Sequence, residues 1–184
     1  MDLFTAIDSR SSAARLKPPA PDAAQLDRIL KAAAHAPDHG HMAPWRFIIL
    51  EGASRDRLAD AIAESRRRRD PRASPDALEA VRQKVLRAPM IIVVGCAAQQ
   101  NHPKIPEIEQ VLAAGAATQN LLLAAHALGF GAVWKTGPAA YDPIVKAGLG
   151  LAPTDHIIAM VHIGTPEAMN PIRPPQLEDR VRRG

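Results

Sequence analysis

The chain has 184 residues, a length that fits one domain with a core of its own. With a formal net charge of only +4 and 3% aromatic residues, it lacks the side chains of a base-stacking nucleic-acid surface. Its single cysteine, Cys96, cannot form an internal disulfide and lies in an apolar run, so we expect a buried thiol. No signal-peptide pattern opens the chain and no stretch is apolar over the roughly 18 residues of a membrane span, which predicts a soluble, cytoplasmic protein.

The first half of the chain predicts four helices and one strand. Asp22, Ser54 and Ser74 each precede a helical pattern and are suitable N-caps. The four consecutive arginines from Arg66 to Arg69 come at a predicted helix end, where cations suit the helix dipole. We therefore favour a solvated helix end over a binding site for a 2′-phosphate. In order, the predicted elements are a helix over 3–9, an extended linker over 17–21, a helix over 23–35, a strand over 46–51, and helices over 55–68 and 75–86.

The second half predicts three more strands around one long helix. In order, the predicted elements are a strand over 90–96, helices over 107–128 and 141–147, strands over 132–136 and 156–163, and a Pro-rich tail over 164–184. From Val111 onward the long helix carries no charge, and a helix that is apolar on every side is buried on every side. In a chain this small, a dimer interface covers such a helix more easily than a monomer does. The intermixed helices and four strands predict an α+β layered fold in a single domain, 1–184, and no strand leads into a Gly-rich dinucleotide motif.

A short polar segment near the start, Arg10-Ser11-Ser12, follows the first helix. A guanidinium group and two hydroxyls are well suited to binding a phosphate. The alternative is an ordinary solvated helix terminus. Later in the chain, Trp134-Lys135-Thr136 combines an aromatic ring, a cation and a hydroxyl at a strand end, which could line a ring-shaped ligand. A buried Trp followed by an exposed turn is the alternative there.

A third polar segment lies between Pro37 and Pro44, which stiffen a short connection from helix to strand. His35 and His39 are spaced as metal ligands on one helix would be, but Pro37 interrupts a helix there and no acidic or sulfur ligand follows at a suitable spacing. We therefore predict no metal site. Contact with an anion or cofactor is favoured, and an ordinary surface loop remains the alternative.

Taken together and in their order along the chain, these segments resemble the nitroreductase family of FMN-dependent NAD(P)H oxidoreductases. The chain also resembles a compact bacterial branch of that family in its shortness, its Asp38-His39 pair and its Trp134-Lys135-Thr136 segment. The resemblance covers most of the chain. The matching motifs are Arg10-x-Ser12, Ala36-Pro37 with Pro44-Trp45-x-Phe47, the run from Gly115 to Gly131 with Gln119-Asn120-Leu121, and Gly164-Thr165-Pro166 with the later Arg173-Pro174.

The resemblance implies a central, mostly antiparallel sheet flanked by helices, with the long helix at the interface of an obligate homodimer. It also implies FMN at that interface, NAD(P)H as hydride donor, and electron-poor acceptors such as nitroaromatics or quinones. Because the flavin carries the chemistry, no catalytic acid or base is assigned. The implied site residues are Arg10, Ser11, Ser12 and Arg173 around the phosphate, Trp134, Lys135 and Thr136 flanking the isoalloxazine, and His35 and His39 from the partner subunit.

The chain departs from the family pattern at one position that bears on the flavin. Two residues after the motif serine, where the family usually has a basic residue that balances charge on the reduced flavin, stands Ala14. Arg15 or Lys135 would then take that role. Two other functions on the same fold stay open: enoate or dehalogenating reduction, and flavin binding without turnover.

Overall fold

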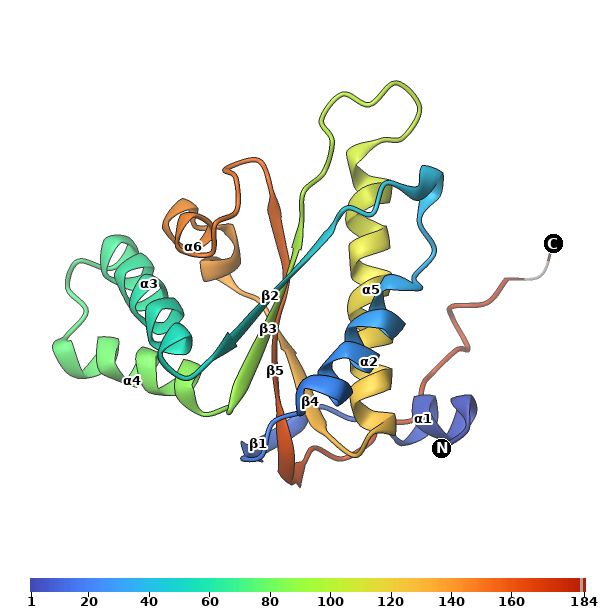
Figure 1. Cartoon of the computed structure of the whole chain (residues 1–184), viewed down its shortest axis with the longest axis horizontal. Helices are drawn as coiled ribbons and strands as arrows, with labels where there is room; N and C mark the ends of the chain where they lie inside the picture. Colours follow the sequence, from blue (N-terminus) through green and yellow to red (C-terminus); the bar gives the residue numbers. More distant parts are fainter. Residues whose placement is uncertain (183) are drawn as a thin grey trace.

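The computed structural model describes residues 1–182 and 184. Figure 1 shows a twisted sheet with helices on both faces. The strands are β1 (Ala13–Lys17), β2 (Trp45–Glu51), β3 (Met90–Cys96), β4 (Gly131–Lys135) and β5 (His156–Met169). The helices are α1 (Leu3–Ser9), α2 (Ala23–Ala34), α3 (Ala53–Arg69), α4 (Pro75–Leu86), α5 (Glu107–Ala127) and α6 (Pro143–Gly148), with 3₁₀ turns η1 (His39–His41) and η2 (Pro138–Tyr141).

The sheet is antiparallel at every described pairing and has the order β1-β5-β3-β2, with β4 also paired to β5. Strand β3 is buried along its whole length, as its continuous apolar sequence requires. The long β5 pairs with β3 and β4 through its first half and with β1 through its last residues. The expected α+β fold with a mostly antiparallel central sheet is confirmed.

Two apolar cores lie on the two faces of the sheet. Side chains of a strand alternate between faces, so Ile92 and Val94 pack with α2 and α5, whereas Ile91 and Val93 pack on the side of α3, α4 and α6. Figure 1 shows this division, with α2 and α5 to the right of the sheet and the other three helices to its left. The buried Cys96 belongs to this interior, and burial raises the pKa of its thiol to about 11, as expected for an inert cysteine.

Most predicted elements are found, and three predictions are wrong. The sheet has five strands rather than four, and the additional strand is β1. No strand was predicted there because the AARLK sequence of β1 has no β-branched residue. Strand β5 continues to Met169, since β1 pairs with its end, so the Pro-rich tail begins later than expected. Ser54 does not cap α3: Gly52 is the N-cap, and the Ser54 hydroxyl donates to the Glu51 carbonyl from within the helix. Asp22 and Ser74 do cap α2 and α4.

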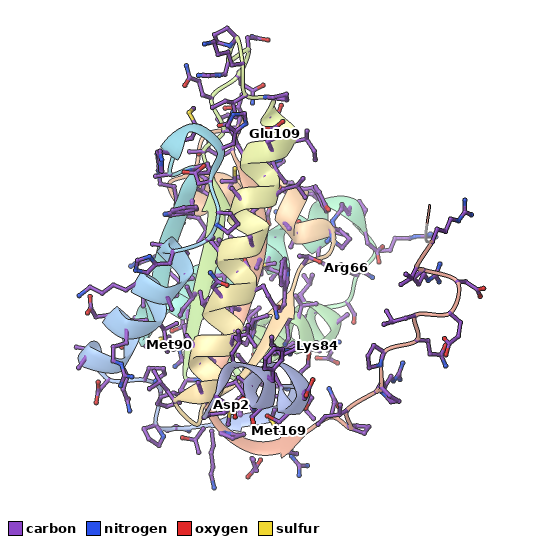
Figure 2. The ribbon with its side chains drawn as sticks, turned by 90° about the vertical axis from the view of Figure 1, so that its right-hand side faces the viewer. Asp2, Arg66, Lys84, Met90, Glu109 and Met169 are labelled. Atoms are coloured by element: carbon purple, nitrogen blue, oxygen red, sulfur yellow. The ribbon has the colours of Figure 1, made fainter. Side chains whose placement is uncertain are left out.

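The long helix α5 is buried on one side only within this chain. Its inner face packs on the sheet, while Ile108 and Leu112 are 59% and 64% exposed. Figure 2 shows α5 running along an open face of the molecule, beside α1. None of the described helices combines the length and apolar character that crossing a membrane requires.

Candidate functional site

One pocket, of about 890 Å³, brings together four of the predicted site residues, which are Arg10, Ser11, Ser12 and Arg173. We call it the arginine pocket. The first three residues follow α1, and Arg173 lies in the tail beyond β5, so the two ends of the sequence meet there. The amide of Asn170 donates a hydrogen bond of 3.0 Å to the Ser12 carbonyl and ties the tail to this segment. The remaining lining residues are Ile7, Asp8, Asn170, Pro171, Ile172, Pro174 and Pro175.

The arginine pocket is held at the C-terminal end of α5. Helix α1 ends at Ser9, whose hydroxyl lies 2.8 Å from Nε2 of His126, and the chain leaves the helix in an extended conformation at Arg10. Burial lowers the pKa of His126, and the positive charge of Arg10 acts in the same direction. Among residues 1–182 and 184, neither Arg10 nor Arg173 forms an ion pair. The two guanidinium groups and two hydroxyls make a donor set that fits a phosphate, whereas the carboxylate of Asp8, which also lines the pocket, is an acceptor and does not add to that set.

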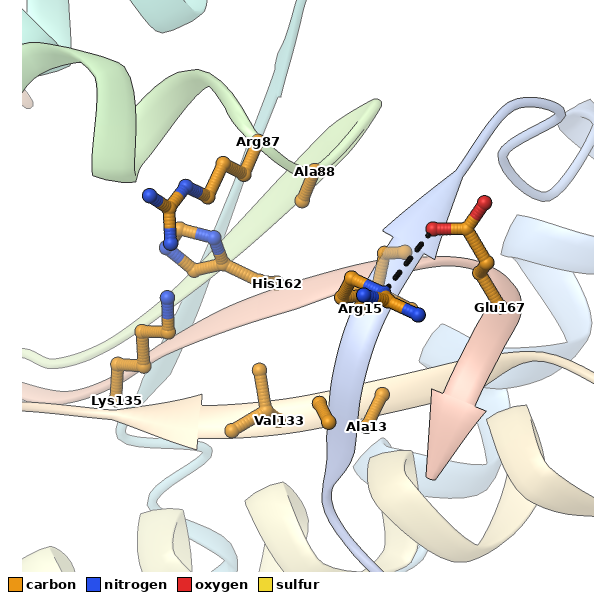
Figure 3. A pocket seen from close by; sticks show the side chains of 10 residues that line it. Ala13, Arg15, Arg87, Ala88, Val133, Lys135, His162 and Glu167 are labelled. Carbon is orange, nitrogen blue, oxygen red and sulfur yellow. Dashed lines mark ion pairs between the residues drawn. The ribbon is translucent and has the colours of Figure 1, made fainter. Parts of the chain in front are cut away.

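A second cavity, of about 350 Å³, lies on the side of the sheet that carries α4; we call it the lysine cavity. Figure 3 shows Arg87, Lys135 and His162 directing their polar ends into the same space, with the Arg15–Glu167 ion pair at its other end. In that pair, Nε of Arg15 lies 3.3 Å from a Glu167 carboxylate oxygen. The other lining residues are Ala13, Ala14, Leu16, Ala88 and Val133.

The lysine cavity is electropositive. Burial lowers the pKa of His162 to about 3, and the Lys135 ammonium acts in the same direction, so its imidazole is neutral at physiological pH. Lys135 is accessible to solvent, yet partial desolvation lowers its pKa, with the charges of Arg87 and Lys84 adding to the effect. In the described part of the chain, Arg87 and Lys135 have no carboxylate partner.

The structure places the segment Trp134-Lys135-Thr136 on two faces of the sheet. Neighbouring residues of a strand point to opposite faces, so Lys135 lines the lysine cavity and Trp134 does not. The indole Nε1 of Trp134 donates to the Ile158 carbonyl at 3.0 Å. Thr136 follows the end of β4 and is exposed.

His39 lies far from the arginine pocket within one chain. Both His35 and His39 are exposed, and Nδ1 of His39 lies 2.5 Å from a carboxylate oxygen of Glu109 in the first turn of α5. Since Glu109 and His126 are near opposite ends of α5, they are about 26 Å apart at 1.5 Å per residue. One protomer therefore cannot place His39 and Arg10 around the same ligand.

The connection that carries these histidines is ordered by its own contacts. Oδ2 of Asp38 accepts a 2.6 Å hydrogen bond from the Ala43 amide, while Gly40, His41 and Ala43 adopt left-handed backbone conformations. Such strained residues persist only where neighbouring contacts hold them, which is common at functional loops. Among the residues that the structure describes, no three His, Cys, Asp or Glu side chains gather as a metal-ligand set.

Sequence reasoning missed three polar residues of the lysine cavity, which are Arg87, His162 and Glu167. His162 lies in the apolar run of β5, where its position indicates only an inward-facing core residue. Arg87 follows α4 and has the sequence character of an ordinary helix-end cation. The four arginines at the end of α3, by contrast, remain a helix end: Arg66, Arg67 and Arg68 pair with Asp70 and Glu64 of the same segment.

Comparisons with known proteins agree with this architecture. The sequence profile described as the nitroreductase family matches residues 7–165. The chain is 37% identical over 168 residues to Escherichia coli YdjA, provisionally named an NAD(P)H nitroreductase, covering 91% of this chain and 90% of that protein. A nitroreductase-like family protein from Bacillus cereus has a TM-score of 0.84 at 26% identity, over 99% and 95% of the two chains. A Desulfovibrio desulfuricans protein solved in complex with FMN has a TM-score of 0.75 at 27% identity, over 98% and 96%.

The chain therefore belongs to the nitroreductase family, a family of oxidoreductases. The resemblance drawn from its motifs is confirmed, as is the expectation of an enzyme of this class.

Proposed function

We propose that this chain is an NAD(P)H-dependent FMN oxidoreductase whose flavin phosphate is held in the arginine pocket. The observation that carries the proposal is the convergence of Arg10 and Arg173, from opposite ends of the chain, with Ser11 and Ser12. Two related proteins support the choice of ligand: one was solved with FMN, and the name of the other includes NAD(P)H.

The residues of this pocket suit a phosphate dianion. Each guanidinium presents a planar fork of N–H donors that can bind two phosphate oxygens, and the two serine hydroxyls add further donors. Bound FMN supplies hydride transfer from NAD(P)H to an acceptor, so the protein itself needs no acid or base. Nitroaromatics and quinones are the proposed acceptors, because they are electron-poor and take electrons with little help from protein groups. Trp134, Lys135 and Thr136 are proposed to lie beside the flavin ring.

We also propose that the functional unit is a homodimer formed through α5. Ile108 and Leu112 leave an apolar strip on the open face of this helix. A two-fold axis across α5 would bring the N-terminal end of one copy beside the C-terminal end of the other. His35 and His39 of one subunit would then lie close to the arginine pocket of the second, an arrangement that for His39 the separation within one chain otherwise prevents.

FMN binding tests the phosphate assignment. The wild-type protein, stripped of flavin, is titrated with FMN and followed by flavin fluorescence. Arg10→Ala and Arg173→Ala are each expected to weaken binding at least tenfold, because each removes a charge-assisted contact of about 1.5–3 kcal/mol. Arg28→Ala, at an exposed position of α2, is the matched control and is expected to bind like wild type. A wild-type protein that does not bind FMN at micromolar concentration would refute the proposal.

Reduction tests the oxidoreductase assignment separately. Anaerobic addition of NADPH or NADH is expected to bleach the visible absorption of the bound flavin, and a quinone or nitroaromatic should restore it. Flavin that binds but is not bleached by either nucleotide would instead indicate a flavin-binding protein without turnover.

A further inference from the structure

The segment Arg10-Ser11-Ser12 is held between two different anchors. After it, β1 begins at Ala13, which pairs with Met169 of β5. The Ser12 carbonyl adds a hydrogen bond from the amide of Asn170 on the same side. Before it, Arg10 follows α1 directly. The sheet therefore fixes the Ser12 end of the segment, whereas the position of the Arg10 guanidinium depends on how the end of α1 is held.

Helix α1 has few contacts of its own to hold it in place. It has seven residues, fewer than a helix needs to be stable alone in water, and Ala6 is its one buried residue. Its larger side chains Leu3 and Phe4 are exposed. In the part of the chain that the structure describes, one side-chain hydrogen bond joins α1 to another element, and it links Ser9 to His126 of α5. That bond lies at the last residue of α1, next to the arginine pocket.

The imidazole of His126 is the donor in this hydrogen bond. The Ser9 hydroxyl donates to the Thr5 carbonyl at 2.5 Å, and the hydroxyl oxygen lies 2.8 Å from Nε2 of His126. A hydroxyl has one proton and a carbonyl can only accept, so the second bond takes its hydrogen from Nε2 of the imidazole. The neutral Nε2–H tautomer and the imidazolium both provide that hydrogen, and the anchor does not depend on the charge of His126.

We propose that His126 is a positioning residue for the cofactor phosphate: by donating to Ser9 it fixes the end of α1 and directs the Arg10 guanidinium into the arginine pocket. This inference rests on the proposed function, because it takes the phosphate of FMN as the ligand of that pocket. His126 does not itself line the pocket and acts through Ser9. The charge of Arg10 adds to burial in lowering the pKa of His126, as expected for two groups that lie close together.

A comparison of FMN with riboflavin, which has the same ring but no phosphate, isolates this role. His126→Leu keeps a side chain of similar bulk but cannot donate. It should weaken FMN binding about three- to tenfold, the range of one lost hydrogen bond, and leave riboflavin binding within about twofold of wild type. His126→Gln is the matched control, because its amide N–H can take the place of Nε2–H, and it should bind FMN within about twofold of wild type. Ser9→Ala removes the acceptor and should behave like His126→Leu.

Double variants test whether His126 acts through Arg10, with FMN as the only ligand. In Arg10→Ala, the further change His126→Leu should weaken FMN binding by less than about twofold, because the group that it directs is gone. In Arg173→Ala, whose arginine lies in the tail, His126→Leu should keep its full effect.

Four results would each overturn the inference. His126→Leu could bind FMN like wild type, or lose the same factor for riboflavin as for FMN. His126→Gln could lose as much as His126→Leu, or the effect of His126→Leu could persist in full in Arg10→Ala. In each of these cases FMN still binds the wild-type protein, whereas failure of wild type to bind FMN overturns the proposed function itself.

Discussion

The buried histidine of β5 should make the protein sensitive to mild acid. His162 is 5% exposed and lies on the floor of the lysine cavity, where burial and Lys135 lower its pKa to about 3. In the unfolded chain the imidazole has its ordinary pKa near 6.5. Between these two values the unfolded state binds more protons than the folded state, so stability falls as the pH falls from about 6.5 toward about 3.

The size of the effect follows from the two pKa values. At pH 7 the unfolded imidazole is mostly neutral, so its protonation takes almost nothing from the free energy of unfolding. At pH 5 the unfolded imidazole is almost fully protonated while the folded one remains neutral, and this loss of stability grows to about 2 kcal/mol. We therefore expect His162 to lower the free energy of unfolding by about 2 kcal/mol between pH 7 and pH 5.

A neutral replacement isolates this contribution. His162→Gln keeps a polar side chain of comparable reach but cannot take up a proton in this range. Urea unfolding of wild type and variant, at one protein concentration and at pH 7, 6 and 5, gives the two stability profiles. The wild type should lose about 2 kcal/mol more than the variant over this range.

Carboxylates contribute equally to both proteins, so they cancel in the comparison. Parallel profiles for wild type and His162→Gln would refute the reasoning, because they would mean that the folded imidazole takes up a proton as readily as the unfolded one. A profile that is steeper for the variant would refute it as well.

Three further substitutions test the packing, one helix cap and the open face of α5. Gly164→Ala should lower the free energy of unfolding by about 1–3 kcal/mol, because a new Cβ would lie 2.6 Å from Cγ of Pro89. Urea unfolding measures this loss of stability, and an unchanged midpoint would contradict the close packing of β5. Asp22→Ala should lower the free energy of unfolding by about 1 kcal/mol, because it breaks the capping box with Gln25. Urea unfolding measures this as well, and an unchanged stability would mean that the cap contributes nothing. Leu112→Glu should shift the protein from dimer to monomer in light scattering after gel filtration, whereas an unchanged mass would contradict the interface through α5.

Local patterns predicted the helices well because they depend on neighbouring residues. Helix α2 begins after Asp22 and α4 after Ser74, as capping chemistry requires, and the apolar run of β3 has the predicted bounds. Strand β1 was missed because it exists through its partner: its sequence has weak strand character, and it forms by pairing with the end of β5, some 150 residues later. The length of β5 was underestimated for the same reason.

Motif order in the sequence was enough to predict the family and the fold class, and it singled out four residues that line the arginine pocket, since such order can be read without knowing how the chain folds back. Which of the predicted site residues lie in the same cavity depends on how distant segments pack together. The tertiary structure separated Trp134 from Lys135, because strand neighbours point to opposite faces, and it placed His39 at the far end of α5 from Arg10. It also brought Arg87 and His162 into the lysine cavity, because that neighbourhood depends on the register between β4 and β5 and on where α4 ends, and no local pattern encodes either.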